Sequence, residues 1–274
     1  MTTPRLPHRL RTGHADLEYL VLGSGAPVTV FAHGLAGSVH ELHGMAGGVR
    51  GTRVLFNFRG HGNSRCRPED INGYAGLADD LAAMADHTGA RQVFGLSMGA
   101  SAAVRVLAAQ PDRFDRAVLL RPTTLDVPLD ERVQAEARTV AAASERGDRA
   151  VLRHFLAQRI PAARRGSRSI AELIDLRVEV LAGPGGRATV AAVAQSTPRT
   201  TPAQLSRVRT AALVMGSLGD PLHPESTAQR IAAALPRSSL HICRGHGAAW
   251  HQRTHIRDFA VRFLNATDGA RAAA

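Results

Sequence analysis

A serine between two glycines is the residue best placed to do chemistry. Ser97 lies in Gly95-Leu96-Ser97-Met98-Gly99, after a short apolar run at 92–96 and before small and aliphatic residues at 100–110. A serine at such a strand-to-helix turn has strained backbone dihedrals, so its neighbours must be small. The free N–H groups at the start of the helix point at the reaction centre. We therefore predict that Ser97 is a nucleophile; the alternative is a glycine-rich turn that only packs a helix on a strand.

A second glycine-rich segment, His33-Gly34-Leu35-Ala36-Gly37, follows another apolar run at 28–32. Attack of a serine on a carbonyl carbon builds negative charge on the carbonyl oxygen, and two preorganised N–H donors usually stabilise that charge. We predict that the backbone N–H groups of Leu35 and Met98 form this oxyanion hole. A flexible glycine-rich loop is the alternative. We expect His33 to shape the loop rather than to act as a base.

The elements that position these residues alternate along the chain. Short apolar runs predict buried strands, and apolar residues at helical spacing predict helices. The expected strands are 16–23, 28–32, 52–58, 92–96, 117–120, 211–215 and 239–243, and the expected helices are 71–87, 100–110, 225–235 and 256–264. This alternation predicts an α/β fold with a mostly parallel central sheet flanked by helices on both faces.

The alternation is interrupted at 122–210, where no strand is expected and apolar residues recur at helical spacing. We predict a first core segment at 1–121, an inserted helical cap at 122–210, a second core segment at 211–266 and a flexible tail at 267–274. The block at 122–210 has 14 Arg against 9 Asp and Glu. These arginines are either a solvated helix face or include a clamp for a substrate carboxylate over Ser97.

The composition narrows the classes of function. The chain has 274 residues, 44% of them hydrophobic, and a formal net charge of +11, and all 34 basic residues are arginine. Because the arginines are spread along the chain and aromatics make up only 4%, we expect no nucleic-acid partner, and polyanion binding is the alternative.

The same sequence carries no sign of a membrane or a metal. No apolar run approaches the ~20 residues that span a bilayer, and the first residues lack the apolar run of a signal peptide. Cys66 and Cys243 form no metal-binding pair. We expect two free thiols in a reducing cytoplasm, and neither a metal nor a cofactor.

Together these segments resemble the α/β-hydrolase fold superfamily, over nearly the whole chain. The opening LVLGSGAP and VFAHG are similar to its second and third strands. The loop 57–64, NFRGHGNS, resembles the family's D-x-R-G-H-G-x-S, with Asn57 in place of the aspartate. Family members of this layout carry a cap where the helical block lies here.

The resemblance implies a Ser-Asp-His triad in the chain order of this fold. The family's base is a histidine after the last strand, a position that His246 matches, with His241, His251 and His255 as competitors. The family's acid follows the strand at 211–215, where Asp220 stands. Asp126 is the alternative acid. We expect His223 to belong to the turn, with a role in lining the site as the alternative.

The nucleophile type limits the reaction. Dehalogenases and epoxide hydrolases of this fold carry aspartate at the elbow, so Ser97 predicts acyl chemistry instead. We expect a cofactor-independent hydrolase that cleaves a small carboxylic ester or lactone through an acyl-enzyme. The alternatives are C–C bond hydrolysis or perhydrolysis with the same triad, and a non-catalytic ligand-binding protein.

Overall fold

The computed structural model describes residues 7–244 and 252–267. One sheet forms its centre, in the order β1-β2-β4-β3-β6-β7-β8-β9, with β5 paired to β2. The strands are β1 His8–Arg11, β2 Ala15–Leu22, β3 Val28–Ala32, β4 Thr52–Phe56, β5 Arg65–Cys66, β6 Gln92–Leu96, β7 Arg116–Leu120, β8 Ala211–Ser217 and β9 Ser238–Cys243.

The sheet is mostly parallel, as the sequence predicts. β1 and β4 both run antiparallel to β2, and every neighbouring pair from β4 through β9 is parallel. The carboxyl ends of the parallel strands therefore share one edge of the sheet. In open sheets of this kind, ligands bind outside that edge.

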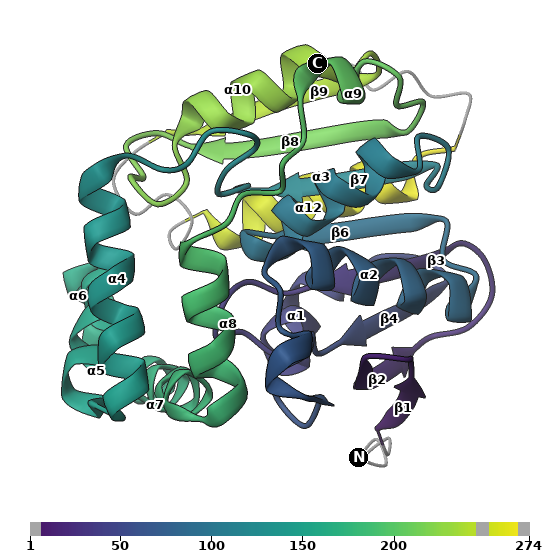
Figure 1. Cartoon of the computed structure of the whole chain (residues 1–274). Helices are drawn as coiled ribbons and strands as arrows, with labels where there is room; N and C mark the ends of the chain where they lie inside the picture. Colours follow the sequence, from purple (N-terminus) through teal and green to yellow (C-terminus); the bar gives the residue numbers. More distant parts are fainter. Residues whose placement is uncertain (1–6, 245–251, 268–274) are drawn as a thin grey trace.

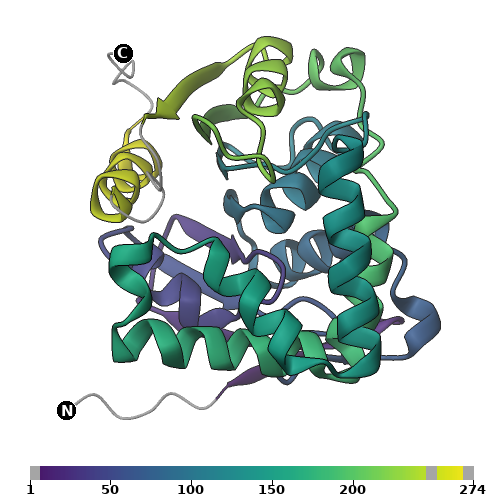
Figure 2. The same cartoon turned by 90° about the vertical axis from the view of Figure 1, so that its left-hand side faces the viewer.

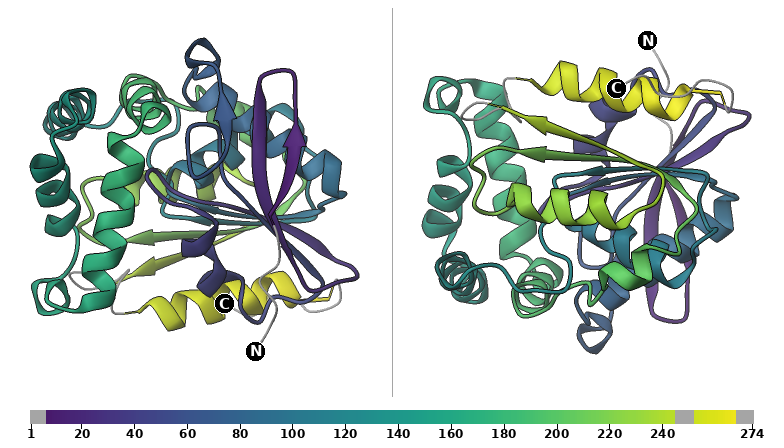
Figure 3. Two further views of the ribbon diagram at one scale, coloured as in Figure 1. Left: turned by 90° about the horizontal axis from the view of Figure 1, so that it is seen from below. Right: turned by 90° about the horizontal axis from the view of Figure 1, so that it is seen from above.

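Helices cover both faces of the sheet (Figure 1). The helices are α1 Val39–Ala46, α2 Tyr74–Thr88, α3 Met98–Ala109, α4 Glu131–Arg146, α5 Arg149–Gln158, α6 Ala162–Arg165, α7 Arg168–Ala182, α8 Pro184–Ala194, α9 Pro202–Leu205, α10 Glu225–Ala234 and α12 Arg253–Asn265, with a 3-10 turn at Pro68–Asp70. One core cluster joins the sheet to α2, α3 and α10, and a second joins the opposite face to α1 and α12. Figure 3 shows the two helical layers from below and from above.

The helical insert α4–α8 lies to one side of the sheet, and Figure 2 looks directly onto it. The insert has a small core of its own, which includes Val140, Leu152, Ile174 and Leu181 and also contacts Ala36 of the glycine-rich loop after β3. Segment 122–210 contains helices and no strand, as predicted. α9 packs against α3 and α10 of the core.

The elements that were not expected from the sequence include β1 and α1. Strand β1 is exposed and shows no apolar alternation, so its sequence does not predict a strand. It forms by antiparallel pairing with β2. Helix α1 buries Val39, Leu42 and Met45 against the sheet, but histidines and a glycine obscure that spacing. No helix within the described ranges is both long and apolar enough to cross a bilayer.

Candidate active site

Ser97 occupies a sharp turn between β6 and α3. Its φ of 53° and ψ of −114° are strained for a residue with a side chain. The two glycines of the motif have no room for a Cβ: at Gly95 it would lie 2.7 Å from the Cα of Ala100, and at Gly99 2.4 Å from the carbonyl oxygen of Ala32. The backbone N–H of Ser97 donates to the carbonyl of Leu120 at 2.8 Å. These contacts hold the hydroxyl at the carboxyl edge of the sheet.

The loop after β3 lies beside this serine. A Cβ at Gly34 would lie 3.3 Å from the Cβ of Ser97. The loop turns tightly, with a hydrogen bond from the Gly37 N–H to the Gly34 carbonyl at 2.9 Å and a φ of 59° at Ala36. Leu35 therefore lies next to the nucleophile, and Met98 is the first residue of α3, whose N–H has no acceptor inside the helix.

Two buried histidines support that loop. His61 Nε2 accepts the N–H of Ala36 at 3.2 Å, and His33 Nε2 accepts the N–H of Phe58 at 3.1 Å. Burial away from water lowers the pKa of His33 to about 4 and the pKa of His61 to about 3. Both rings are therefore neutral near pH 7 and can accept these backbone protons.

A histidine contacts Ser97, and it is His223. Its Nε2 lies 2.8 Å from Ser97 Oγ, and its Nδ1 lies 2.9 Å from Asp220 Oδ2. Both residues belong to the turn between β8 and α10. The imidazole is buried, with 4% of its side chain exposed. Ser97, His223 and Asp220 thus form a continuous hydrogen-bonded chain.

The sequence predicted His246 for this position beside the serine. His246 lies at 245–251, outside the described residues, so its prediction is untouched by these contacts. The signal for His223 was the three-residue spacing from Asp220, which places a carboxylate and an imidazole on one turn. The spacing alone does not predict a catalytic role for His223, because the contact with Ser97 joins residues that are far apart in sequence.

The two carboxylate oxygens of Asp220 have different partners. Oδ1 accepts the backbone N–H groups of Leu222 and His223, at 3.1 and 3.2 Å, and shapes the turn. Oδ2 faces the imidazole of His223 and the guanidinium of Arg121. Partial burial raises the pKa of Asp220, but the hydrogen bond from His223 and the charges of His223 and Arg121 outweigh burial and leave this pKa well below its usual range.

Arg121 is the fourth member of this cluster, and sequence analysis did not single it out. It follows β7 with a φ of 52°, and its Nη2 lies 3.1 Å from Asp220 Oδ2 and 2.9 Å from His223 Nδ1. Burial, followed by the charge of Arg121, lowers the pKa of His223. His223 is therefore neutral near pH 7. The tautomer that carries its proton on Nδ1 donates to Asp220 and leaves Nε2 to accept from Ser97, whereas the opposite tautomer leaves Nδ1 to accept from Arg121 Nη2.

The remaining candidates lie elsewhere. Asp126 Oδ1 pairs with Arg230 Nη2 at 2.6 Å. The ring of His241 stacks on Phe259 with 4.5 Å between centroids, and His255 also lies against Phe259. His251 is outside the described residues. Within the described ranges no group of His, Cys, Asp and Glu side chains could hold a metal ion.

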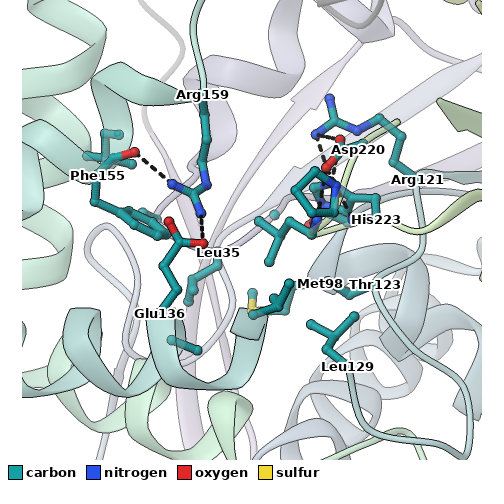
Figure 4. Close-up of a pocket in the computed structure, with 18 of the residues that line it drawn as sticks. Leu35, Met98, Arg121, Thr123, Leu129, Glu136, Phe155, Arg159, Asp220 and His223 are labelled. Atoms are coloured by element: carbon teal, nitrogen blue, oxygen red, sulfur yellow. Dashed lines mark hydrogen bonds and ion pairs between the residues drawn. The ribbon is translucent and has the colours of Figure 1, made fainter. Parts of the chain in front are cut away.

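A cavity of about 960 Å³ opens over Ser97, between the edge of the sheet and the helical insert. Figure 4 shows Met98 and His223 on one side and Phe155 and Arg159, from the insert, on the other. Its walls combine apolar side chains with arginines from both parts of the chain. The cavity is large enough for a small organic substrate.

Comparison with known proteins places this arrangement in a family. Residues 27–250 match the family described as alpha/beta hydrolase fold, whereas no curated protein matches. The fold is similar to an enol-lactonase from Burkholderia xenovorans LB400 (TM-score 0.80, 18% identity, 94% of this chain and 100% of that chain). It is also similar to the esterase EaEST from Exiguobacterium antarcticum (0.76, 16%, 92% and 96%) and to carboxylesterase CesB from Bacillus subtilis (0.77, 16%, 98% and 94%). The chain has the serine turn, the glycine-rich loop and the mostly parallel sheet with a helical insert. Because the family match also covers most of its length, this chain belongs to the α/β hydrolase fold family.

Proposed function

We propose that the protein is a serine hydrolase that cleaves a small carboxylic ester or lactone through an acyl-enzyme. The observation that carries the proposal is the 2.8 Å contact between Ser97 Oγ and an imidazole nitrogen, at a strained turn that opens into the cavity. A serine hydroxyl becomes a strong nucleophile only when a base takes its proton.

The proposed reaction has two halves. In the first, Ser97 Oγ attacks the acyl carbon as the histidine removes its proton, and the N–H groups of Leu35 and Met98 stabilise the oxyanion. The histidine then gives the proton to the leaving alcohol, which in a lactone stays attached to the acyl chain. In the second half the histidine activates water, which hydrolyses the acyl-enzyme. Asp220 orients the histidine and stabilises its charged form.

Two histidines compete for the role of base. His246 has the position that family members use, after the last strand, and His223 has the contacts with Ser97 and Asp220. In this proposal, whichever histidine is the base acts with the same serine and the same acid. Substitution by glutamine separates them, because glutamine keeps hydrogen-bonding capacity but cannot take up a proton.

The first test is labelling with a fluorophosphonate probe, read by intact mass. We expect one adduct on the wild-type protein and none on Ser97→Ala. An adduct that persists on Ser97→Ala contradicts the assignment of the nucleophile. No adduct on either protein contradicts hydrolysis and favours a ligand-binding protein.

The second test measures ester hydrolysis by His223→Gln and His246→Gln. Loss of a triad member lowers kcat by about 10⁴-fold or more. The variant that loses this much identifies the base, and a loss confined to His246→Gln assigns His223 to the wall of the cavity. If both variants keep wild-type rates, histidine catalysis is wrong.

A further inference from the structure

The cavity is lined by more positively charged than negatively charged side chains. Six of the lining residues are arginines, namely Arg121, Arg132, Arg159, Arg165, Arg177 and Arg253. The acidic lining residues are Glu41, Glu136 and Asp220. The cavity wall therefore carries more positive than negative charge.

Two of the arginines that line the cavity have a carboxylate partner across it or beside it. Arg121 pairs with Asp220, and Arg177 of α7 pairs with Glu41 of α1. Arg253 lies over α1, where its Nη2 donates to the carbonyl oxygen of Glu41 at 3.4 Å. Of these three arginines, Arg121 from the core and Arg177 from the insert each have a close carboxylate partner.

The part of the cavity formed by α4, α5 and α6 differs. Arg132 and Glu136 lie one turn apart on α4, and Arg159 Nη2 pairs with Glu136 Oε2 at 2.9 Å. Arg165 lies beside this pair, because its Nε donates to the Ile160 carbonyl at 2.8 Å and its Nη2 to the Gln158 carbonyl at 3.4 Å. This wall therefore carries three guanidinium groups and one carboxylate, and that carboxylate pairs with Arg159.

The pair between Arg159 and Glu136 indicates which anion the wall accepts. Arg159 is fixed by the Phe155 carbonyl, which accepts from its Nη1 at 2.8 Å, and by the Phe155 ring, whose centroid is 3.4 Å from its central carbon. Its Nη2 already binds one carboxylate. Figure 4 shows the side chain reaching from the insert into the cavity, on the side that faces His223. Arg132 and Arg165 are exposed and lie where the cavity meets solvent.

We propose that Arg132, Arg159 and Arg165 form an anion subsite that binds a carboxylate of the substrate while Ser97 attacks a carbonyl at the other end of the cavity. This inference rests on the proposed function, because it names the class of ester. The insert also contributes apolar side chains to the wall, among them Val133, Val140, Leu156 and Ile160. The substrate class is an ester or lactone with an apolar middle and a free carboxylate.

The test compares matched substrates. The 4-nitrophenyl hemiesters of the C4 to C8 dicarboxylic acids carry a free carboxylate, and their methyl-capped counterparts do not. We expect kcat/KM to favour the hemiester at least tenfold for one or more chain lengths, because a charge-assisted hydrogen bond contributes about ten- to a hundredfold to binding. The preference weakens as salt is added. A ratio of one or less at every chain length overturns the subsite.

Three variants test the residues. Arg132→Gln combined with Arg165→Gln removes the two unmatched charges, leaves the Arg159–Glu136 pair intact, and lowers the hemiester preference tenfold or more. Glu136→Gln removes the competing carboxylate and raises the preference. Arg138→Gln is the matched control, because Arg138 lies exposed on α4 and outside the cavity, and it leaves the preference unchanged. An effect of Arg138→Gln equal to that of the double variant overturns the proposal in favour of net charge alone.

A binding measurement separates this inference from the proposed function. Calorimetry of the free C4 to C8 dicarboxylates with Ser97→Ala requires no turnover. Dicarboxylate binding to Ser97→Ala that is lost when the double substitution is added supports the subsite. If the wild-type protein also cleaves no ester, the subsite stands and the hydrolase is contradicted. Ester cleavage without hemiester preference or dicarboxylate binding contradicts the subsite and leaves the hydrolase standing.

Discussion

Asp220 does two jobs at once because its two oxygens point in different directions. Oδ1 caps the turn that carries His223, and Oδ2 meets the imidazole and Arg121. The Asp220 side chain can therefore stabilise the turn and also serve as the acid of a triad. Its negative charge faces one cation that is permanent, Arg121, and one group that gains charge only during the reaction.

Arg121 is expected to set the pH at which the enzyme becomes active. Its positive charge disfavours a charged His223, so removing it raises the pKa of His223, which is the base in this prediction. In Arg121→Met the acid limb of kcat/KM should therefore move to higher pH, by about one unit. Arg121→Lys keeps the charge and should stay near the wild-type limb, and Arg91→Gln, at an exposed arginine, should leave it in place. An unmoved limb in Arg121→Met would show that the guanidinium has no electrostatic effect on the base.

Among single residues, the sequence predicted those that lie in a recognisable local motif. The G-x-S-x-G frame singled out Ser97, and the position after β8 singled out Asp220. Arg121 and Arg159 have no such pattern. Their roles come from the strained backbone after β7 and from the packing of α5 over the cavity, which link residues far apart in sequence.

Among the elements, the loops after β3 and β4 depend on each other through two histidines. His33 and His61 lie with 4.8 Å between ring centroids, and each accepts a backbone N–H from the other loop. Their buried rings cannot take up protons until the pH falls to about 4 and about 3, whereas an unfolded histidine does so near 6.5.

These histidines should make the fold sensitive to mild acid. Between about pH 6.5 and pH 4.5 the unfolded chain binds protons that the folded chain does not, so the free energy of unfolding falls as the pH falls. Each histidine contributes about 1.4 kcal/mol per pH unit in this range. Urea unfolding at several pH values measures the slope, which His61→Gln should reduce and His40→Gln, at an exposed histidine, should not. An equal slope in all three proteins would contradict this account.

The core elements were predictable because each is short, apolar and bounded by glycine, proline or a polar turn. β3, β6 and β7 fall within a residue of their expected positions. Helix α1 was not predictable, because its apolar residues become a helix face only once the sheet covers them. The insert was expected to be helical, but the pairing of α4 with α8 and of α5 with α7 is a matter of tertiary packing.

In the molecule as a whole, the insert and the core are joined across the cavity by the ion pair of Arg177 and Glu41. Both side chains are largely buried, at 23% and 14% exposed. Burial makes the loss of one partner costly, because the other charge stays desolvated.

We therefore expect Glu41→Gln to lower the free energy of unfolding by about 1–3 kcal/mol, less than a fully buried pair because some solvent reaches both groups. The matched control is Glu172→Gln, which breaks the exposed pair with Arg168 on α7 and should cost at most about 0.5 kcal/mol. Chemical unfolding of both variants measures the difference. Equal costs would show that the insert gains nothing from this contact.

The two chain segments that connect the insert to the core run side by side, joined by a hydrogen bond from the Thr200 N–H to the Leu125 carbonyl at 3.5 Å. Residues 121–130 and 195–210 alone are long enough to carry the chain from β7 back to the start of β8, since such a crossover needs about a dozen residues. The insert is thus attached to the core through two neighbouring segments. We expect that replacing it would change the wall of the cavity and leave Ser97, Asp220 and His223 in place, because all three belong to the core.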